Sequence, residues 1–185
     1  FKAHSLAKAK QFKFSVPEAF VVTDKAFTAF LKENKLHSQL NTELERVQVQ
    51  DMHSLDYASR TIHDLILSSP IPEFIQTDVL QQYTHVNSRN VVVRSSLYLE
   101  DKYSSPVSGE LRSYINVPVT EIDEKIKRCW SSLFTPRAIM YIKQREIDLK
   151  KIHLGIIVQR VIDAKASGLL YTKHPVNQDD NQMVV

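Results

Sequence analysis

The stretch NVVVRSSLYLEDKYSSPVSGELRSYINV, residues 90–117, decides the fold of this chain. An apolar run, Val91–Val93, leads into Arg94, and a second strand-like run begins after a loop that contains Gly109. Apolar β-branched runs bounded by Ser, Pro and Gly are typical of strands. The stretch therefore predicts two strands joined by that loop, with an arginine at the end of the first strand.

Outside this stretch, the first half of the chain has helical patterns, and the second half has the patterns of a sheet with packed helices. Apolar residues recur at helical spacing, and Pro and Gly separate the segments. Helices are expected within residues 1–10, 24–34, 36–56, 58–69, 72–83, 121–134 and 137–146. Strands are expected over residues 20–23, 91–94, 111–119, 155–162 and 168–172, the last two as a hairpin. This order predicts an α+β fold, mostly helical over residues 1–89, with a mainly antiparallel sheet within residues 90–185.

The composition bounds the class of protein. The chain has 185 residues, of which 43% are hydrophobic and 24% charged, as in soluble globular domains. A net charge of +3 without basic runs argues against nucleic acid as a partner. No apolar stretch approaches the roughly 18 residues of a membrane span. The single cysteine, Cys129, excludes an internal disulfide and fits the cytoplasm.

The two ends of the sequence indicate a piece of a longer protein. The chain begins with Phe rather than Met, and it stops at the strand-like run MVV. We therefore expect residues 1–185 to form an incomplete domain, with its remainder and further domains elsewhere.

Most of the usual catalytic patterns do not occur. The seven histidines show no i,i+3 or i,i+4 pairs, so a zinc or iron site is not expected. Cys129 lies in an amphipathic segment beside Trp130, which favours a buried thiol over a nucleophile. The sequence has no GxSxG, no GxGxxG and no P-loop motif.

Two polar residues interrupt the apolar runs and therefore need partners. Arg94 could pair with Glu100 or Asp101, or it could hold an anion together with backbone N–H groups near Gly109. Gln159, within IIVQRVI, could contact an adenine edge or a neighbouring strand. The residues alone leave both pairs of alternatives open.

The order of motifs resembles a known family. It runs VVVRSS, LYLED, VSGE and SYINV, then CWSSLFTPRA, IIVQRV and SGLLYTKHP, with FKAHSL and VPEAF near the start. This resembles the N-terminal ATP-grasp domain shared by phosphoenolpyruvate synthase, pyruvate phosphate dikinase and rifampin phosphotransferase, across nearly the whole chain. The resemblance implies an ATP-grasp-like lobe that binds ATP.

The resemblance also assigns roles to individual positions. Lys2 and Arg94 match residues that contact the phosphates of ATP, and Gly109 matches a loop glycine over the nucleotide. Ser113 stands where the family has a threonine that touches ATP, and Gln159 matches a glutamine near the adenine. Arg94 is the residue expected to take part in catalysis.

The family activity implies further partners. ATP is cleaved, and a phosphoryl group passes to a histidine in a separate downstream domain and then to a small-molecule acceptor such as pyruvate. The Mg²⁺ ligands are expected outside residues 1–185, so this segment alone is expected to be inactive.

Several positions depart from the family pattern. Glu110 replaces a glutamine, Ala19 and Phe1 replace glycines, and Lys165 replaces an acidic residue. These departures raise the alternative of a degenerate ATP-grasp module that binds nucleotide or partners without catalysis.

Overall fold

The computed structural model describes residues 2–99, 111–173, 176 and 183–184. The helices are α1 (Lys2–Gln11), α2 (Asp24–Glu33), α3 (Leu36–Arg46), α4 (Met52–Ser68), α5 (Glu73–Val86), α6 (Ile122–Ser131) and α7 (Pro136–Gln144). The strands are β1 (Ala19–Val22), β2 (Asn90–Leu99), β3 (Ser113–Pro118) and β4 (Ile152–Arg160). Short 3₁₀ turns cover Val119–Glu121, Ser132–Phe134 and Leu149–Lys151. The α+β class expected from the sequence is confirmed.

The described strands form one antiparallel sheet in the order β1-β4-β2-β3. The longest ladder joins β2 to β4, from Val91 opposite Arg160 to Leu99 opposite Ile152. The first half of the chain contributes β1, which lies along the outer side of β4. The sheet expected within residues 90–185 therefore takes one edge strand from the helical half.

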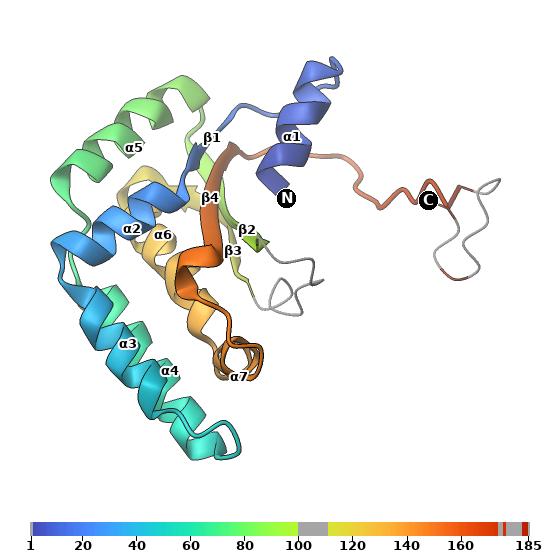
Figure 1. Ribbon diagram of the computed structural model, residues 1–185. Helices are drawn as coiled ribbons and strands as arrows, with labels where there is room; N and C mark the ends of the chain where they lie inside the picture. Colours follow the sequence, from blue (N-terminus) through green and yellow to red (C-terminus); the bar gives the residue numbers. More distant parts are fainter. Residues whose placement is uncertain (1, 100–110, 174–175, 177–182, 185) are drawn as a thin grey trace.

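Helices cover the two faces of this sheet unequally. Figure 1 shows α2 to α6 on one side of the sheet and α1 on the other. Side chains alternate between the two faces along a strand. On β2, Val93 and Ser95 are fully buried toward α6, so Arg94 and Ser96 point to the face that carries α1.

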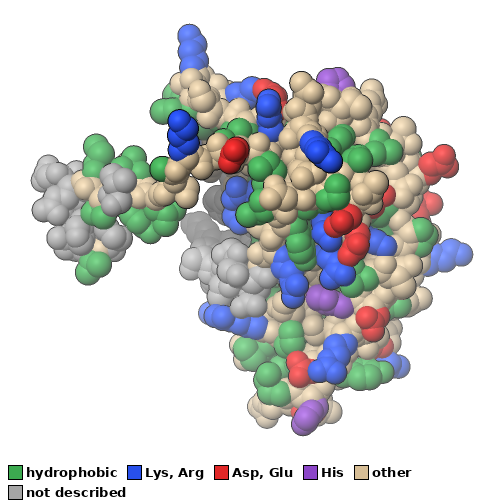
Figure 2. Space-filling view, turned by 180° about the vertical axis from the view of Figure 1, so that it is seen from behind, with side chains coloured by type: hydrophobic (Ala, Val, Ile, Leu, Met, Phe, Trp, Pro, Cys, Tyr) green, Lys and Arg blue, Asp and Glu red, His purple; other side chains and the backbone are tan. Residues whose placement is uncertain are grey.

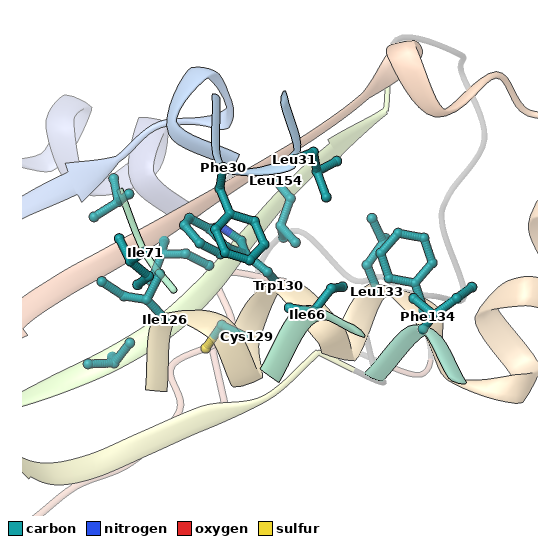
Figure 3. Close-up of a cluster of buried hydrophobic side chains, with 14 of the residues drawn as sticks. Phe30, Leu31, Ile66, Ile71, Ile126, Cys129, Trp130, Leu133, Phe134 and Leu154 are labelled. Carbon is teal, nitrogen blue, oxygen red and sulfur yellow. The ribbon is translucent and has the colours of Figure 1, made fainter. Parts of the chain in front are cut away.

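The main core lies between the sheet and the larger group of helices (Figure 3). Trp130 of α6 is fully buried, and its ring lies 5.0 Å from that of Phe30 and 5.3 Å from that of Phe27. Aromatic pairs at such distances add about 0.5–1.5 kcal/mol beyond the burial of their area. Phe134 is 1% exposed, and its carbonyl accepts a 2.7 Å hydrogen bond from Ser59 of α4. The motif CWSSLF thus joins helices to the core.

Local capping explains where two of the helices begin. The Thr135 hydroxyl accepts a hydrogen bond from the Ala138 N–H at 3.2 Å, and Pro136 occupies the first turn of α7, as expected from the sequence. Helix α4 begins at Met52, earlier than expected, because the Asp51 carboxylate caps it by accepting from the His53 N–H at 2.9 Å.

The strand that contains Arg94 is longer than expected. It continues to Leu99, so Arg94 lies inside β2 and not at its end. The strand continues through two serines because both hydroxyls have partners. The Ser95 hydroxyl donates to the Arg112 carbonyl at 3.2 Å, and the Ser96 hydroxyl accepts from the Ala3 N–H at 3.2 Å.

The hairpin expected between residues 155–162 and 168–172 does not form. Both edges of β4 are already occupied by β1 and β2, so no edge is left for residues 168–172. Tyr171 makes an isolated bridge with Val184 instead. The segment after β4 leads away from the sheet (Figure 1).

The surface carries both signs of charge. Lys and Arg side chains are interspersed with Asp and Glu on the face shown in Figure 2. Within the described part of the chain, no helix combines the length and the apolar character needed to cross a membrane.

Candidate functional site

The candidate site lies on the sheet face that carries α1, here called the α1 face. On β2 this face presents Val92, Arg94, Ser96 and Tyr98, and on β4 it presents Gln159, Ile157, Gly155 and His153 in the matching register. Opposite residues in an antiparallel pair share a face, so these side chains form two adjacent rows. Several chemistry-bearing residues are therefore collected on one surface.

Arg94 occupies the middle of the α1 face. It is paired with Ile157 of β4 on one side and with Ser113 of β3 on the other. Ile157 is fully buried, whereas Ser113 is exposed. The guanidinium therefore stands between an apolar neighbour and a hydroxyl that solvent or a ligand can reach.

One nitrogen of the Arg94 guanidinium lacks a partner among the described residues. This Nε is buried and donates to no described hydrogen-bond partner, and no described carboxylate forms an ion pair with the side chain. A buried donor without a partner costs about 1–3 kcal/mol. The ion pair with Glu100 or Asp101 considered from the sequence concerns residues outside the described part. The Nε atom without a partner favours the alternative in which Arg94 binds an anion.

Lys2 adds a second positive charge beside Arg94. The pKa of Lys2 is lowered, first by the loss of hydration among neighbouring groups and then by the charge of Arg94. The side chain is exposed overall, so this effect is partial. Lys2 and Arg94 lie near one another, and no carboxylate of the described residues forms an ion pair with either of them. Two such cations stabilise a bound anion.

The start of α1 is tied to β2 beside these cations. The Ala3 N–H donates to the Ser96 hydroxyl at 3.2 Å, across 93 positions of sequence. Ser96 lies two residues after Arg94, on the same face. This bond brings the Lys2 end of the helix to the centre of the site.

Gln159 lies at the other end of the α1 face. It is 8% exposed and is paired with Val92 of β2 and Ala19 of β1. Ala19 replaces a glycine of the family pattern, but its backbone is ordinary strand and not left-handed. An alanine fits there without strain, so this departure does not by itself disable the site.

A hollow of about 510 Å³ lies on the same face, and neither Lys2 nor Arg94 is part of its lining. Its lining includes Ala3, Ser96, Gly155 and an Asp24–His153 pair, whose Oδ2 and Nδ1 atoms are 2.6 Å apart. A side chain at Gly155 would meet Val21 at 3.4 Å, so glycine keeps the floor of the hollow open. No sequence pattern predicted the Asp24–His153 pair, because 129 positions separate its two residues.

A larger hollow on the helical side does not fit a phosphate. Its volume is about 730 Å³, and its lining carries the carboxylates of Glu33, Glu73 and Asp78. These negative charges repel anions. The smaller hollow has one carboxylate in its lining, that of Asp24, which is paired with His153, so it repels an anion less.

The other candidates from the sequence are Cys129, Gly109, Glu110 and the possible metal ligands. Cys129 is fully buried, and burial raises the pKa of its thiol to about 11, so it is an inert core residue as expected. Gly109 and Glu110 lie outside the described residues. Among the described residues, no group of three or more His, Cys, Asp or Glu side chains could hold a metal ion.

The comparison with protein families identifies the domain. The model of the pyruvate phosphate dikinase AMP/ATP-binding domain matches residues 2–185. The chain belongs to this family. The family match covers every described element, including the α1 face and the segment that follows β4.

Relatives of this pyruvate phosphate dikinase-type domain include proteins named phosphoenolpyruvate synthase and rifampicin phosphotransferase. A probable phosphoenolpyruvate synthase of Methanocaldococcus jannaschii is 31% identical over 191 residues, which cover 100% of this chain and 16% of the relative. A probable phosphoenolpyruvate synthase of Methanothermobacter thermautotrophicus is 30% identical over 190 residues, which cover 99% of this chain and 28% of the relative. A rifampicin phosphotransferase of Bacillus subtilis is 32% identical over 166 residues, which cover 89% of this chain and 19% of the relative. The chain thus spans between about a sixth and just over a quarter of these proteins.

Proposed function

We propose that this domain binds ATP on the α1 face, with the phosphates held by Lys2 and Arg94. The Ser113 hydroxyl, directly opposite Arg94, is proposed to reach the same phosphates, and Gly109 is proposed to take the role of the nucleotide-contacting glycine of the family pattern. Gln159 lies farther along β4, where it reads the adenine edge. The single observation that carries the proposal is the buried Arg94 Nε without a partner, beside a second cation.

The electrostatics of the apo site support this assignment. The pKa of Lys2 is lowered first by partial loss of hydration and then by the charge of Arg94. A triphosphate between them reverses this effect, since each cation then gains an anionic neighbour. The planar guanidinium suits bidentate contact with phosphate oxygens, whereas the ammonium acts as a point charge.

We further propose that the domain belongs to a longer phosphotransferase. Its relatives are named phosphoenolpyruvate synthase and rifampicin phosphotransferase, which act on different acceptors. In this proposal ATP is cleaved, and a phosphoryl group passes to a histidine of a downstream domain and then to a small acceptor such as pyruvate. Residues of the α1 face hold ATP and do not select the acceptor. The location is the cytoplasm.

Arg94 and Lys2 contribute electrostatic stabilisation and orientation. Phosphoryl transfer depends mainly on positioning and on neutralising the charge of the phosphates. Bound Mg²⁺ would supply part of that neutralisation, and its ligands are proposed to lie outside residues 1–185. The role left to this part of the chain is to fix the phosphates between β2, β3 and α1.

The runner-up is a degenerate module that binds nucleotide or partners without turnover. Glu110, a carboxylate where the family has an amide, is the departure that favours it. Calorimetry with ATP and Mg²⁺ on the full-length protein separates the possibilities. Binding with turnover supports the enzyme, binding without turnover supports a sensor, and no binding supports a scaffold.

The direct test is Arg94→Ala in the full-length protein. We expect ATP-dependent phosphoryl transfer to be abolished while the circular dichroism spectrum and the melting temperature stay close to those of the wild type. Arg60→Ala, which removes an exposed arginine on α4, is the matched control and should retain activity. Undiminished transfer by Arg94→Ala would contradict the assignment.

A further inference from the structure

We infer that Ser96 is a positioning residue, which holds Lys2 beside Arg94 by anchoring the first turn of α1 to β2. The expected consequence, tighter ATP binding, rests on the proposed function. Its structural content, the placement of Lys2, can be measured without ATP.

The anchor is a hydrogen bond between two distant parts of the chain. The Ser96 hydroxyl accepts the Ala3 N–H at 3.2 Å. Ala3 follows Lys2 directly, and Ser96 lies two residues from Arg94 on the same face of β2. The bond therefore fixes the backbone next to one cation relative to the strand that carries the other.

Few other contacts hold α1 in place. None of the described residues of this helix is fully buried. Its far end carries an ion pair between Lys10 and Glu18 at 3.2 Å, in which both side chains are more than half exposed. Exposed pairs of this kind contribute little. The Ser96 bond is therefore a main restraint at the Lys2 end.

The bond also works against an electrostatic force. Partial loss of hydration and then the charge of Arg94 disfavour the charged form of Lys2 before a ligand binds, as its lowered pKa indicates. Without an anchor, the start of α1 can move away and the ammonium can return to water. The hydroxyl acts as a cap supplied by another strand, because it satisfies an N–H of the first helical turn.

The surroundings of Ser96 allow a clean pair of variants. Ser96 is 7% exposed and lines the 510 Å³ hollow, so an added methyl group has space. Thr and Val have nearly the same shape, and both favour strands. Ser96→Thr keeps the accepting hydroxyl, and Ser96→Val removes it, so their difference isolates the hydrogen bond.

The first measurement is ATP binding by calorimetry on the full-length protein. We expect Ser96→Thr to bind ATP nearly as tightly as the wild type and Ser96→Val to bind about tenfold more weakly, as for loss of a helix cap. Thr42→Val removes a hydroxyl that bonds the Ser38 carbonyl within α3. This control should leave ATP affinity unchanged.

The second measurement is the pKa of Lys2 without nucleotide. It can be followed by NMR titration of ¹³C-methylated lysines, with the Lys2 signal assigned through Lys2→Arg. We expect the Lys2 pKa to rise toward its ordinary value in Ser96→Val and to stay lowered in Ser96→Thr. A loss of general stability alone would not produce this difference.

The two measurements separate the two claims. An unchanged Lys2 pKa in folded Ser96→Val would overturn the positioning role. A raised Lys2 pKa with unchanged ATP affinity would uphold that role and contradict the proposed contact between Lys2 and ATP. If Ser96→Val does not fold, Ser96→Ala provides the same comparison with a smaller change of shape.

Discussion

Arg94 of β2 and Ser113 of β3 lie directly opposite each other in an antiparallel ladder. The loop that holds Gly109 and Glu110 joins these two strands in sequence. The Arg94–Ser113 pair is the last pair of this ladder before that loop, although β2 itself continues to Leu99. This arrangement explains how an arginine can follow an apolar run, because its side chain points to the α1 face while Val93 and Ser95 are buried on the core face.

Binding of ATP should be coupled to uptake of a proton. In the free protein the pKa of Lys2 is lowered by incomplete hydration and by Arg94. The triphosphate raises this pKa, so at alkaline pH the complex holds more protons than the free protein. Calorimetry in two buffers with different ionisation enthalpies measures the uptake.

The matched variants for proton uptake are Lys2→Met and Lys8→Met on the same helix. The first should abolish the uptake, and the second should retain it, since Lys8 is exposed. Proton release on binding, or uptake that persists in Lys2→Met, would contradict the placement of the phosphates beside Lys2.

The sequence predicted local features well and long-range pairings poorly. Thr135-Pro136 marks the start of α7 because caps act within one turn. By contrast, the Asp24–His153 contact joins residues 129 positions apart, and no local period encodes such a contact. The same reason explains why the pairing of β1 with β4 and the bond from Ala3 to Ser96 were not foreseen. The expected hairpin after β4 failed because β1 had taken the free edge.

Protein stability should fall at high pH because of Cys129. Burial raises the pKa of its thiol from an ordinary value near 9 to about 11. The unfolded chain therefore loses this proton first as pH rises, which favours unfolding between about pH 9 and pH 11. The loss is on the order of 3 kcal/mol over that range.

Denaturant unfolding at several pH values checks the Cys129 effect. Cys129→Ala should show a smaller decline of the unfolding free energy between pH 9 and pH 11 than the wild type does. The thiol should also resist Ellman's reagent until the protein unfolds. Rapid labelling of the native thiol would show that Cys129 is not buried.

The Asp24–His153 pair should stabilise the fold at neutral pH and less so in acid. A hydrogen bond from His153 is the main cause that lowers the pKa of Asp24. A carboxyl with a depressed pKa stabilises the fold above its ordinary pKa near 4, and this contribution is lost as pH falls through the depressed value.

The corresponding variant is Asp24→Asn, compared with the wild type by urea unfolding at pH 7 and in acid. The side chains are 39% and 33% exposed, so we expect a difference of under about 1 kcal/mol at pH 7. The difference should shrink as the pH falls below 4. A difference that grows in acid would contradict the pairing.

Lys127 of α6 should matter more for stability than other lysines. Its ammonium donates to the Leu67 carbonyl at 2.6 Å and to the Ser69 carbonyl at 3.0 Å, at the end of α4. Hydrogen bonds to charged groups contribute about 1.5–3 kcal/mol. We expect Lys127→Met to lower the unfolding free energy by about that amount, while Lys32→Met, at an exposed position, has little effect. Equal effects of the two variants would show that the Lys127 contacts contribute nothing.

The central claim is that Arg94 holds the phosphates of ATP on the α1 face. Its most direct test is calorimetry of ATP and adenosine with the full-length wild type, Arg94→Met and the control Arg60→Met. We predict that Arg94→Met weakens ATP binding by roughly 10- to 150-fold, as expected for one charge-assisted contact, and leaves adenosine binding unchanged. Equal affinity of Arg94→Met and wild type for ATP would contradict the claim.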